Sequence, residues 1–205
     1  MLRGSGVAVV DPARLSGVMD DRTRWNERYE TADDTDSPPA VVARLRPLLP
    51  TLGRALDVAG GRGTTSAAMA ELGLDVTLVD VSDVALERVT DRAQRLGLSI
   101  RTERRDLRSD GLPPGEWDVI CCFHYLDRDL LAQLVEALAP GGLLAVAIAT
   151  RTNLERHHRP SADHLLDDGE LAAYAEAHPD LAVVSHTEGW NEHDRHEAEL
   201  FARKI

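Results

Sequence analysis

The sequence predicts a doubly wound α/β fold, in which a Rossmann-like, mostly parallel, seven-stranded sheet forms the middle of three layers (α/β/α). From residue 54 onward, short apolar segments alternate with segments of helical periodicity. The apolar segments are continuous, which is typical of parallel strands covered by helices on both faces. Two strand-like segments follow each other near the C-terminus, so we expect a C-terminal antiparallel hairpin to complete the sheet.

Capping residues, glycines and prolines indicate where these elements begin and end. Ser82 is expected to cap one helix and Gly97 to close it, while Pro140 ends another. Asp167 and Glu170 have the spacing of a capping box before the last helix. The expected strands are residues 54–58, 75–79, 99–103, 117–122, 143–149, 181–185 and 196–203. The expected helices are residues 22–29, 40–49, 64–72, 83–96 and 129–139, and a last one ending near residue 179. A polar loop of about ten residues is expected to join the last two strands.

Length and charge exclude several classes of protein. The 205 residues suit one domain, which we place at residues 21–205 after a flexible extension of residues 1–20. Lysine and arginine number 23 against 35 aspartates and glutamates, a net charge of −12 that repels polyphosphate. We therefore expect no nucleic-acid partner and no anionic membrane partner. The sequence does not determine the oligomeric state.

Hydropathy and cysteine usage predict a cytoplasmic chain. No apolar run approaches the ~20 residues of a membrane-spanning helix, and the first ten residues are too weakly apolar for a signal peptide. The two cysteines, Cys121 and Cys122, are adjacent in an expected strand, so their side chains point to opposite faces. Such a pair is unsuited to a disulfide and has no zinc-site spacing, and we expect it to be buried.

Polar and glycine-rich segments follow four successive expected strands, at the edge where open α/β sheets bind ligands. The first segment contains Gly60, Gly61 and Gly63, which let the backbone approach a ligand closely and open a helix N-terminus. Asp80 ends the second strand and can accept hydrogen bonds from both hydroxyls of a ribose. Asp106 follows the third strand and can accept one from an exocyclic adenine amine. The fourth segment is Phe-His-Tyr at residues 123–125.

These residues carry a resemblance to the class I S-adenosylmethionine-dependent methyltransferase family over residues 57–142. DVAGGRG at residues 57–63 resembles the first motif, D/E-x-G-x-G-x-G, with Ala59 in place of the first glycine. An alanine suits that position if its φ stays negative. LVDVS, RRDL, WDVICCFHYL and LAPGGLL resemble the later motifs in the same order. With WNERY at residues 25–29, the chain from residue 20 on is similar to the branch that holds tellurite-resistance-type and thiopurine-type methyltransferases.

The resemblance implies a single class I methyltransferase domain that uses S-adenosylmethionine. The family's activity would be direct displacement of the methyl group by an oxygen, nitrogen, sulfur or other chalcogen atom of a small molecule. Residues 21–50 would form lid helices, and residues 150–166 a loop on the substrate side. Nucleic-acid amino methyltransferases usually have N/D-P-P-Y where residues 123–125 stand, which again argues against a nucleic-acid target. The residues implied in cofactor binding are Asp57, Ala59, Gly60, Gly61, Gly63, Asp80, Val81, Asp106, Leu107, Phe123, Trp25 and Tyr29.

His124 is the candidate catalytic residue, because a histidine there can accept a proton from a substrate hydroxyl. A hydrogen-bonded histidine at the sheet edge is the alternative. The other histidines, at residues 157, 158, 164, 178, 186, 193 and 196, have no convincing metal-ligand spacing, and we expect no metal site.

Two other functions stay open at this point. A nicotinamide-dependent oxidoreductase would have G-x-G-x-x-G, but Ser66 stands where its third glycine would be. A noncatalytic sensor that binds S-adenosylmethionine would use the same glycine turn as an enzyme.

Overall fold

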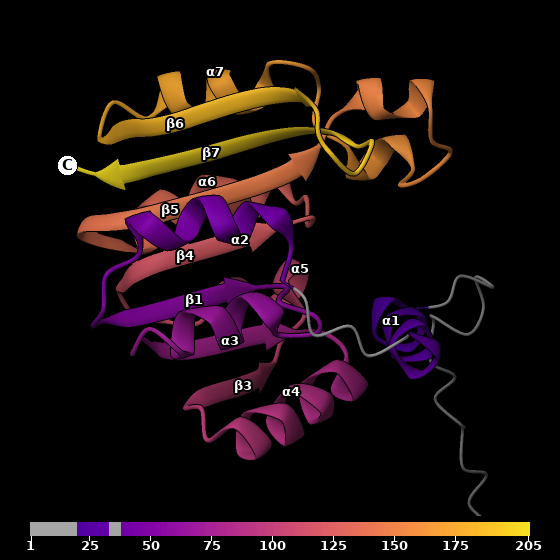
Figure 1. Cartoon of the computed structure of the whole chain (residues 1–205). Coiled ribbons are helices and arrows are strands. Elements are labelled where there is room, and N and C mark those ends of the chain that lie inside the picture. The colour runs from indigo at the N-terminus through magenta and orange to yellow at the C-terminus, as the bar shows by residue number, and fades with distance from the viewer. Residues whose placement is uncertain (1–19, 33–37) are drawn as a thin grey trace, which may run out of the picture.

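The computed structural model of the chain describes residues 20–32 and 38–205, so the expected N-terminal extension lies outside the described residues except for residue 20. The strands are β1 (Arg54–Val58), β2 (Asp75–Asp80), β3 (Ile100–Arg104), β4 (Trp117–Phe123), β5 (Leu138–Ala149), β6 (Leu181–Trp190) and β7 (His196–Lys204). They form one seven-stranded sheet in the order β3-β2-β1-β4-β5-β7-β6. Pairings from β3 to β5 are parallel, whereas β7 is antiparallel to both β5 and β6, which confirms the predicted fold (Figure 1).

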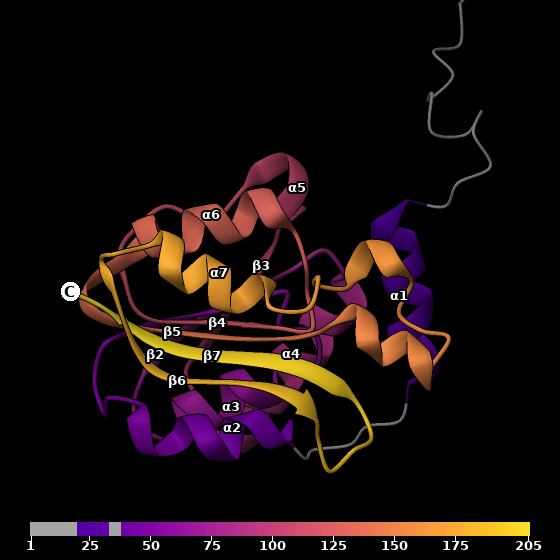
Figure 2. The ribbon, with the colours of Figure 1, turned by 90° about the horizontal axis from the view of Figure 1, so that it is seen from above.

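Helices cover both faces of this sheet. The helices are α1 (Asp21–Thr31), α2 (Ala40–Leu45), α3 (Thr64–Ala70), α4 (Asp83–Leu96), α5 (Leu107–Asp110), α6 (Arg128–Ala137) and α7 (Glu170–Ala177). The described residues also include three short 3-10 helices, η2 (Arg46–Leu48), η3 (Arg151–Glu155) and η4 (Ala162–His164). Figure 2 shows α2, α3 and α4 on one face and α5, α6 and α7 on the other. The strand order reverses between β1 and β4, and open α/β sheets bind ligands outside the carboxyl ends of their strands at such a reversal.

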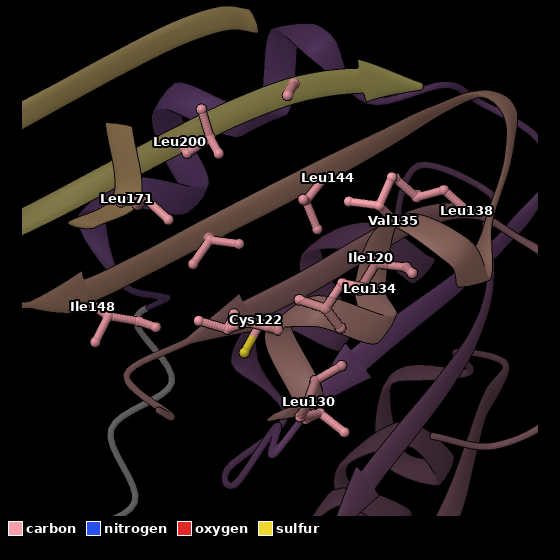
Figure 3. Close-up of a cluster of buried hydrophobic side chains, with 14 of the residues drawn as sticks. Ile120, Cys122, Leu130, Leu134, Val135, Leu138, Leu144, Ile148, Leu171 and Leu200 are labelled. Carbon is pink, nitrogen blue, oxygen red and sulfur yellow. The ribbon is translucent and has the colours of Figure 1, made fainter. Parts of the chain in front are cut away.

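Two large apolar clusters fill most of the space between the sheet and its helices, and a third, of Leu78, Leu86 and Val89, lies under α4. The larger cluster joins β4 and β5 to α6 and α7, and Figure 3 shows Ile120, Leu134 and Leu144 among its members. The smaller cluster lies under α2 and α3 on the opposite face. Cys122 belongs to the first cluster and Cys121 to the second, so the expectation of a buried pair on opposite faces is confirmed.

Side-chain caps explain where several helices begin. The Ser82 hydroxyl accepts the N–H of Ala85 at 3.2 Å, and Gly97 closes α4 with a φ of +66°. The capping box expected before α7 forms only in part. The Glu170 carboxylate accepts the N–H of Asp167, but Gly169 occupies the N-cap position.

Several helix ends differ from the predicted bounds by a few residues, and two strands are each five residues longer than predicted, for local reasons. β5 begins at Leu138, because Leu138 pairs with Trp117 before the Pro-Gly-Gly bulge at residues 140–142 and pairing resumes at Leu143. β6 extends to Trp190, so the connection to β7 has five residues, 191–195, and not about ten. Asn191 closes this connection, since its side-chain oxygen accepts the N–H groups of His193 and Arg195.

The assigned core predicts how two leucine substitutions change the free energy of unfolding. Leu134 on α6 is fully buried, whereas Leu52 is 78% exposed. Leu134→Ala leaves a cavity and is expected to lower the free energy of unfolding by about 2–5 kcal/mol. The matched Leu52→Ala change is expected to stay within about 0.5 kcal/mol of the parent. Urea unfolding followed by circular dichroism measures both, and equal effects of the two variants would contradict the assigned core.

Candidate functional site

The turn between β1 and α3 consists of backbone in an uncommon conformation. The φ angles of Ala59, Gly61 and Gly63 are +51°, +51° and +67°. The N–H of Gly60 donates to the carbonyl of Val79 on β2 at 3.1 Å. Within the turn, the N–H of Gly63 donates to the carbonyl of Gly60. The expectation of a negative φ at Ala59 is therefore wrong, because the turn needs a left-handed residue directly after β1. An alanine there stores strain that a glycine would avoid.

Asp80 at the tip of β2 holds this turn in place. One carboxylate oxygen accepts the N–H of Gly61 and the other accepts the N–H of Ser82, both at 2.9 Å. Burial raises the pKa of Asp80, while these backbone N–H groups act in the opposite direction. The carboxylate therefore connects the glycine turn with the start of α4. Val81, which follows Asp80, is half-buried at the same strand tip.

Asp57 lies near the carboxyl end of β1, two residues before the glycine turn begins at Ala59, and its side chain is directed at α3. Its carboxylate accepts the hydroxyl of Ser66 at 2.6 Å, and only 3% of the residue is exposed. Burial raises its pKa to about 7, the Ser66 hydrogen bonds lower it, and the nearby Asp80 carboxylate raises it. In this structure Asp57 orients the glycine turn from within and has little surface for direct ligand contact.

Helix α1 packs over the glycine turn, beyond the edge of the sheet. Asn26 accepts the hydroxyl of Ser82 at 2.7 Å, and the Arg22 guanidinium pairs with Asp83 at 2.6 Å, so α1 is attached to the start of α4. The Tyr29 hydroxyl lies against Gly61, where an added Cβ would come within 2.3 Å of it. Figure 1 shows α1 beyond the carboxyl ends of the parallel strands.

Trp25 and Tyr29 stack with ring centroids 5.7 Å apart. Guanidinium groups of Arg28 and Arg24 lie 5.0 and 5.9 Å from the Trp25 ring. Arginines therefore lie over the Trp25 ring, whereas the Tyr29 ring reaches the turn with its hydroxyl against Gly61. Burial raises the pKa of the Tyr29 hydroxyl, which keeps it neutral.

Asp106 follows β3 at the same edge of the sheet, since the N–H of Arg105 donates to the carbonyl of Asp80 at 2.9 Å. Its carboxylate caps α5 by accepting the N–H of Arg108 at 3.1 Å. Leu107, the first residue of α5, is buried. The sequence did not predict α5, because four helical residues are too short to show periodicity.

The tip of β4 brings His124 next to a glutamate that sequence reasoning missed. Phe123 is buried, and His124 follows it in a left-handed conformation with a φ of +60°. Nε2 of His124 lies 3.2 Å from Oε1 of Glu197 on β7, which also lies 3.1 Å from Nε of Arg195. Neither contact has hydrogen-bond geometry, so this buried oxygen has no hydrogen-bond partner among the described residues. Burial raises the pKa of Glu197, but His124, Arg195 and Asn191 outweigh it and lower the pKa overall.

Glu197 was missed because only the sheet order places it there. Residues 124 and 197 are far apart in the sequence, and β5 lies between β4 and β7. An acidic residue inside an apolar C-terminal strand, as in HEAELFAR at residues 196–203, was the available signal.

The histidines do not gather around a common point. His196 binds the Thr150 hydroxyl at 2.7 Å and lies near the carboxylates of Asp168 and Glu188, with one possible ligand atom of each within 4.8 Å. Both carboxylates already accept hydrogen bonds, Asp168 from Thr152 and Glu188 from the N–H of Gly169. The expectation of no metal site stays a prediction.

Comparison with known proteins connects this geometry to a family. Residues 55–142 match the model of a family described as a methyltransferase domain. The chain is 33% identical over 107 residues to the ubiquinone biosynthesis O-methyltransferase of Caulobacter sp. (strain K31), covering 48% of this chain and 42% of that protein. It is 33% identical over 109 residues to the mitochondrial counterpart of Schizosaccharomyces pombe, covering 49% and 39%. The match thus spans about two fifths of the length of these relatives.

Solved structures share the fold at low sequence identity. TehB from Haemophilus influenzae has a TM-score of 0.70 at 18% identity, covering 88% of this chain and 67% of that chain. NodS from Bradyrhizobium japonicum WM9, an N-methyltransferase in complex with S-adenosylhomocysteine, has 0.70 at 20%, covering 90% and 99%. The [4+2]-cyclase SpnF has 0.63 at 18%, covering 80% and 78%.

The fold is that of the Rossmann-like methyltransferases. The matched segment, residues 55–142, and the order of its motifs are similar to those of the class I S-adenosylmethionine-dependent methyltransferase family. Among the described residues, no helix combines the length and the apolar character needed to span a membrane.

Asp57 predicts a pH dependence of stability. Its pKa is raised from 3.8 to about 7 in the folded chain, so the folded state binds this proton more tightly than the unfolded state. Its contribution to the free energy of unfolding is therefore complete below pH 3.8 and is lost as the pH rises through about 7. Asp57→Asn removes the titration. The stability of the parent relative to this variant should therefore decline as the pH rises from 5 to about 7.5.

Urea unfolding at several pH values measures this difference, with the exposed Asp75→Asn as the control. A difference between the parent and Asp57→Asn that does not change with pH would contradict the raised pKa.

Proposed function

We propose that this chain transfers a methyl group from S-adenosylmethionine to a small-molecule acceptor by direct displacement. The observation that carries the proposal is the left-handed turn of residues 59–63, held against the tip of β2 by the Asp80–Gly61 hydrogen bond. This turn lies inside the segment that matches the methyltransferase family. Bound S-adenosylmethionine would supply a methyl group on an already activated sulfonium, so the chain has to bind, align and exclude water.

Each part of the site has a role in this proposal. The turn, with Ala59, Gly60, Gly61 and Gly63, would hold the methionine end of the cofactor. Asp80 would accept the ribose hydroxyls, because a carboxylate oxygen that already accepts one N–H has a further lone pair. Val81, Asp106 and Leu107 would line the adenine side, and Phe123 the floor of the crevice. Asp57 would act indirectly, by fixing the turn through Ser66.

The lid roles rest on the position of two segments. Helix α1 places Tyr29 over Gly61, where it would exclude water from the cofactor. Residues 150–166, with η3 and η4, lie beyond the same carboxyl ends of the strands as α1 (Figures 1 and 2). We propose that these two segments enclose the acceptor between them.

His124 is the proposed base when the acceptor atom is oxygen. The nearby Glu197 carboxylate would stabilise the imidazolium that forms when His124 takes the proton. A thiol or another soft chalcogen acceptor needs no base, because its anion is strongly nucleophilic and is already present as a fraction of the acceptor at neutral pH.

The cofactor assignment predicts a binding defect. Asp80→Asn removes the charge that would bind the ribose, and its affinity for S-adenosylhomocysteine is expected to fall at least about tenfold, the loss of one charge-assisted hydrogen bond. Asp75→Asn, at the other end of β2, is exposed and is expected to bind like the parent. Isothermal titration calorimetry measures both affinities, with NAD as the competing ligand. Heat with NAD and none with S-adenosylhomocysteine would contradict the proposal.

The base assignment predicts a kinetic defect. A screen of small molecules with methyl-labelled S-adenosylmethionine identifies an acceptor. With an oxygen acceptor, His124→Gln is expected to lower kcat by roughly 10²–10⁴-fold without changing cofactor affinity. Unchanged turnover in this variant would show that His124 is not the base.

A second candidate function is binding of S-adenosylmethionine without methyl transfer. The likeness to the [4+2]-cyclase SpnF supports considering it, since that protein's name describes a different reaction on this fold. Stoichiometric cofactor binding with no labelled product from a broad library would favour this candidate.

A further inference from the structure

A cationic cavity opens at the acceptor side of the proposed site. It has a volume of about 490 Å³ and is lined by Asn153, Arg156, His157, His158, Arg159 and Arg195. Except for Asn153, every lining residue is basic, in a chain with a net charge of −12. The charge of the residues that line this cavity is therefore opposite in sign to the net charge of the chain.

The walls of the cavity are held in place by contacts outside it. The Arg156 guanidinium stacks on the Trp190 ring, 3.8 Å from its centroid, and pairs with Asp194 at 2.5 Å. His157 approaches the same aspartate, with Nε2 3.4 Å from a carboxylate oxygen. A guanidinium stacked in this way keeps a fixed orientation, which suits it to binding planar or tetrahedral anions.

The positive charge exceeds the negative charge around the cavity. Three arginines line it, and the carboxylates that contact them are Asp194 and Glu197. The carbonyl of Arg159 accepts a hydrogen bond from the side chain of Asn153, but its exposed guanidinium has no hydrogen-bond or ion-pair partner among the described residues. At least one cation is therefore available to a bound anion.

Arg195 connects this cavity to the candidate catalytic residue. It lines the cavity, and its Nε lies 3.1 Å from the Glu197 oxygen that is itself 3.2 Å from Nε2 of His124. That Glu197 oxygen is buried and has no hydrogen-bond partner among the described residues. An acceptor whose anionic group lies in the cavity would thus extend toward His124.

We propose that this cavity binds an anionic group, a carboxylate or a phosphate, of the methyl acceptor. That the bound anion belongs to the methyl acceptor rests on the proposed function, but anion binding by the cavity can be tested without it. Carboxylates and phosphates share the charge and the multiple oxygen acceptors that arginine recognises. The experiment has to separate these two anions.

The test measures binding of pyrophosphate and of citrate to the full chain by calorimetry at low ionic strength. Arg159→Ser is the informative variant, because this side chain is exposed and has no hydrogen-bond or ion-pair partner among the described residues. Arg101→Ser is the matched control, since Arg101 is exposed on β3, away from the cavity. We expect saturable binding of at least one anion at one site, weakened at least about fivefold by Arg159→Ser and unchanged by Arg101→Ser. The anion that binds more tightly identifies the group.

Two results would overturn the proposal. One is the absence of saturable binding of either anion, and the other is equal weakening by both variants. If the anion binds but S-adenosylhomocysteine does not, the proposed function fails, and the assignment of the cavity to a methyl acceptor fails with it.

A kinetic measurement completes the test. With an acceptor from the labelled-methyl screen, Arg159→Ser is expected to raise KM at least about fivefold with little change in kcat, because it removes binding common to the ground state and the transition state. Turnover of uncharged molecules alone, with KM unaffected by Arg159→Ser, would also contradict the proposal.

Discussion

The hydrogen bond between the Asp80 carboxylate and the N–H of Gly61 is the contact on which the site depends. It joins the tip of β2 to the turn after β1 and, through the Ser82 N–H, to the start of α4. Helix α1 binds that same start of α4 through Asn26. The turn, the strand tip and the helix above them therefore form one connected unit, in which Asp57 and Ser66 support the turn from below.

Steric constraints explain why glycines occupy this turn. A Cβ at Gly60 would come within 2.8 Å of the Asp57 carboxyl carbon and nearer still to Leu78, and one at Gly63 within 2.6 Å of Val89. At Gly61 the Tyr29 hydroxyl occupies the same space. Packing excludes larger residues at these glycines, and the left-handed backbone disfavours them at Gly61 and Gly63, whereas Ala59 adopts the left-handed conformation despite its Cβ.

The fold was predictable from the sequence because its signals are local. The continuous apolar strands, the Ser82 cap and the Gly97 stop each depend on a few neighbouring residues, and the structure agrees with them. The extension of β6 to Trp190 was not predictable, because its polar residues pair with β7 and their own pattern does not indicate a strand. The start of β5 was also predicted too late, because the Pro-Gly-Gly bulge reads as a turn although Leu138 before it already pairs with β4.

The candidate site was predictable only where it is built from consecutive residues. The glycine turn and Asp80 form part of motifs, so their positions followed from spacing. Glu197 reaches His124 across the sheet and also contacts Arg195, and the basic cavity combines residues 153–159 with Arg195, which directly precedes β7. Such contacts between distant segments depend on strand order and on side-chain packing, which no short pattern encodes.

The shared fold does not by itself determine the reaction, since SpnF, a [4+2]-cyclase, has the same architecture. The central claim is that the turn of residues 59–63 and Asp80 bind the adenosyl cofactor beneath α1. A crystal structure of the chain with S-adenosylhomocysteine tests it most directly. The account predicts ribose hydroxyls on the Asp80 carboxylate and the sulfur beside the glycine turn, facing His124. A ligand bound elsewhere, with the Asp80–Gly61 crevice left to water, would contradict it.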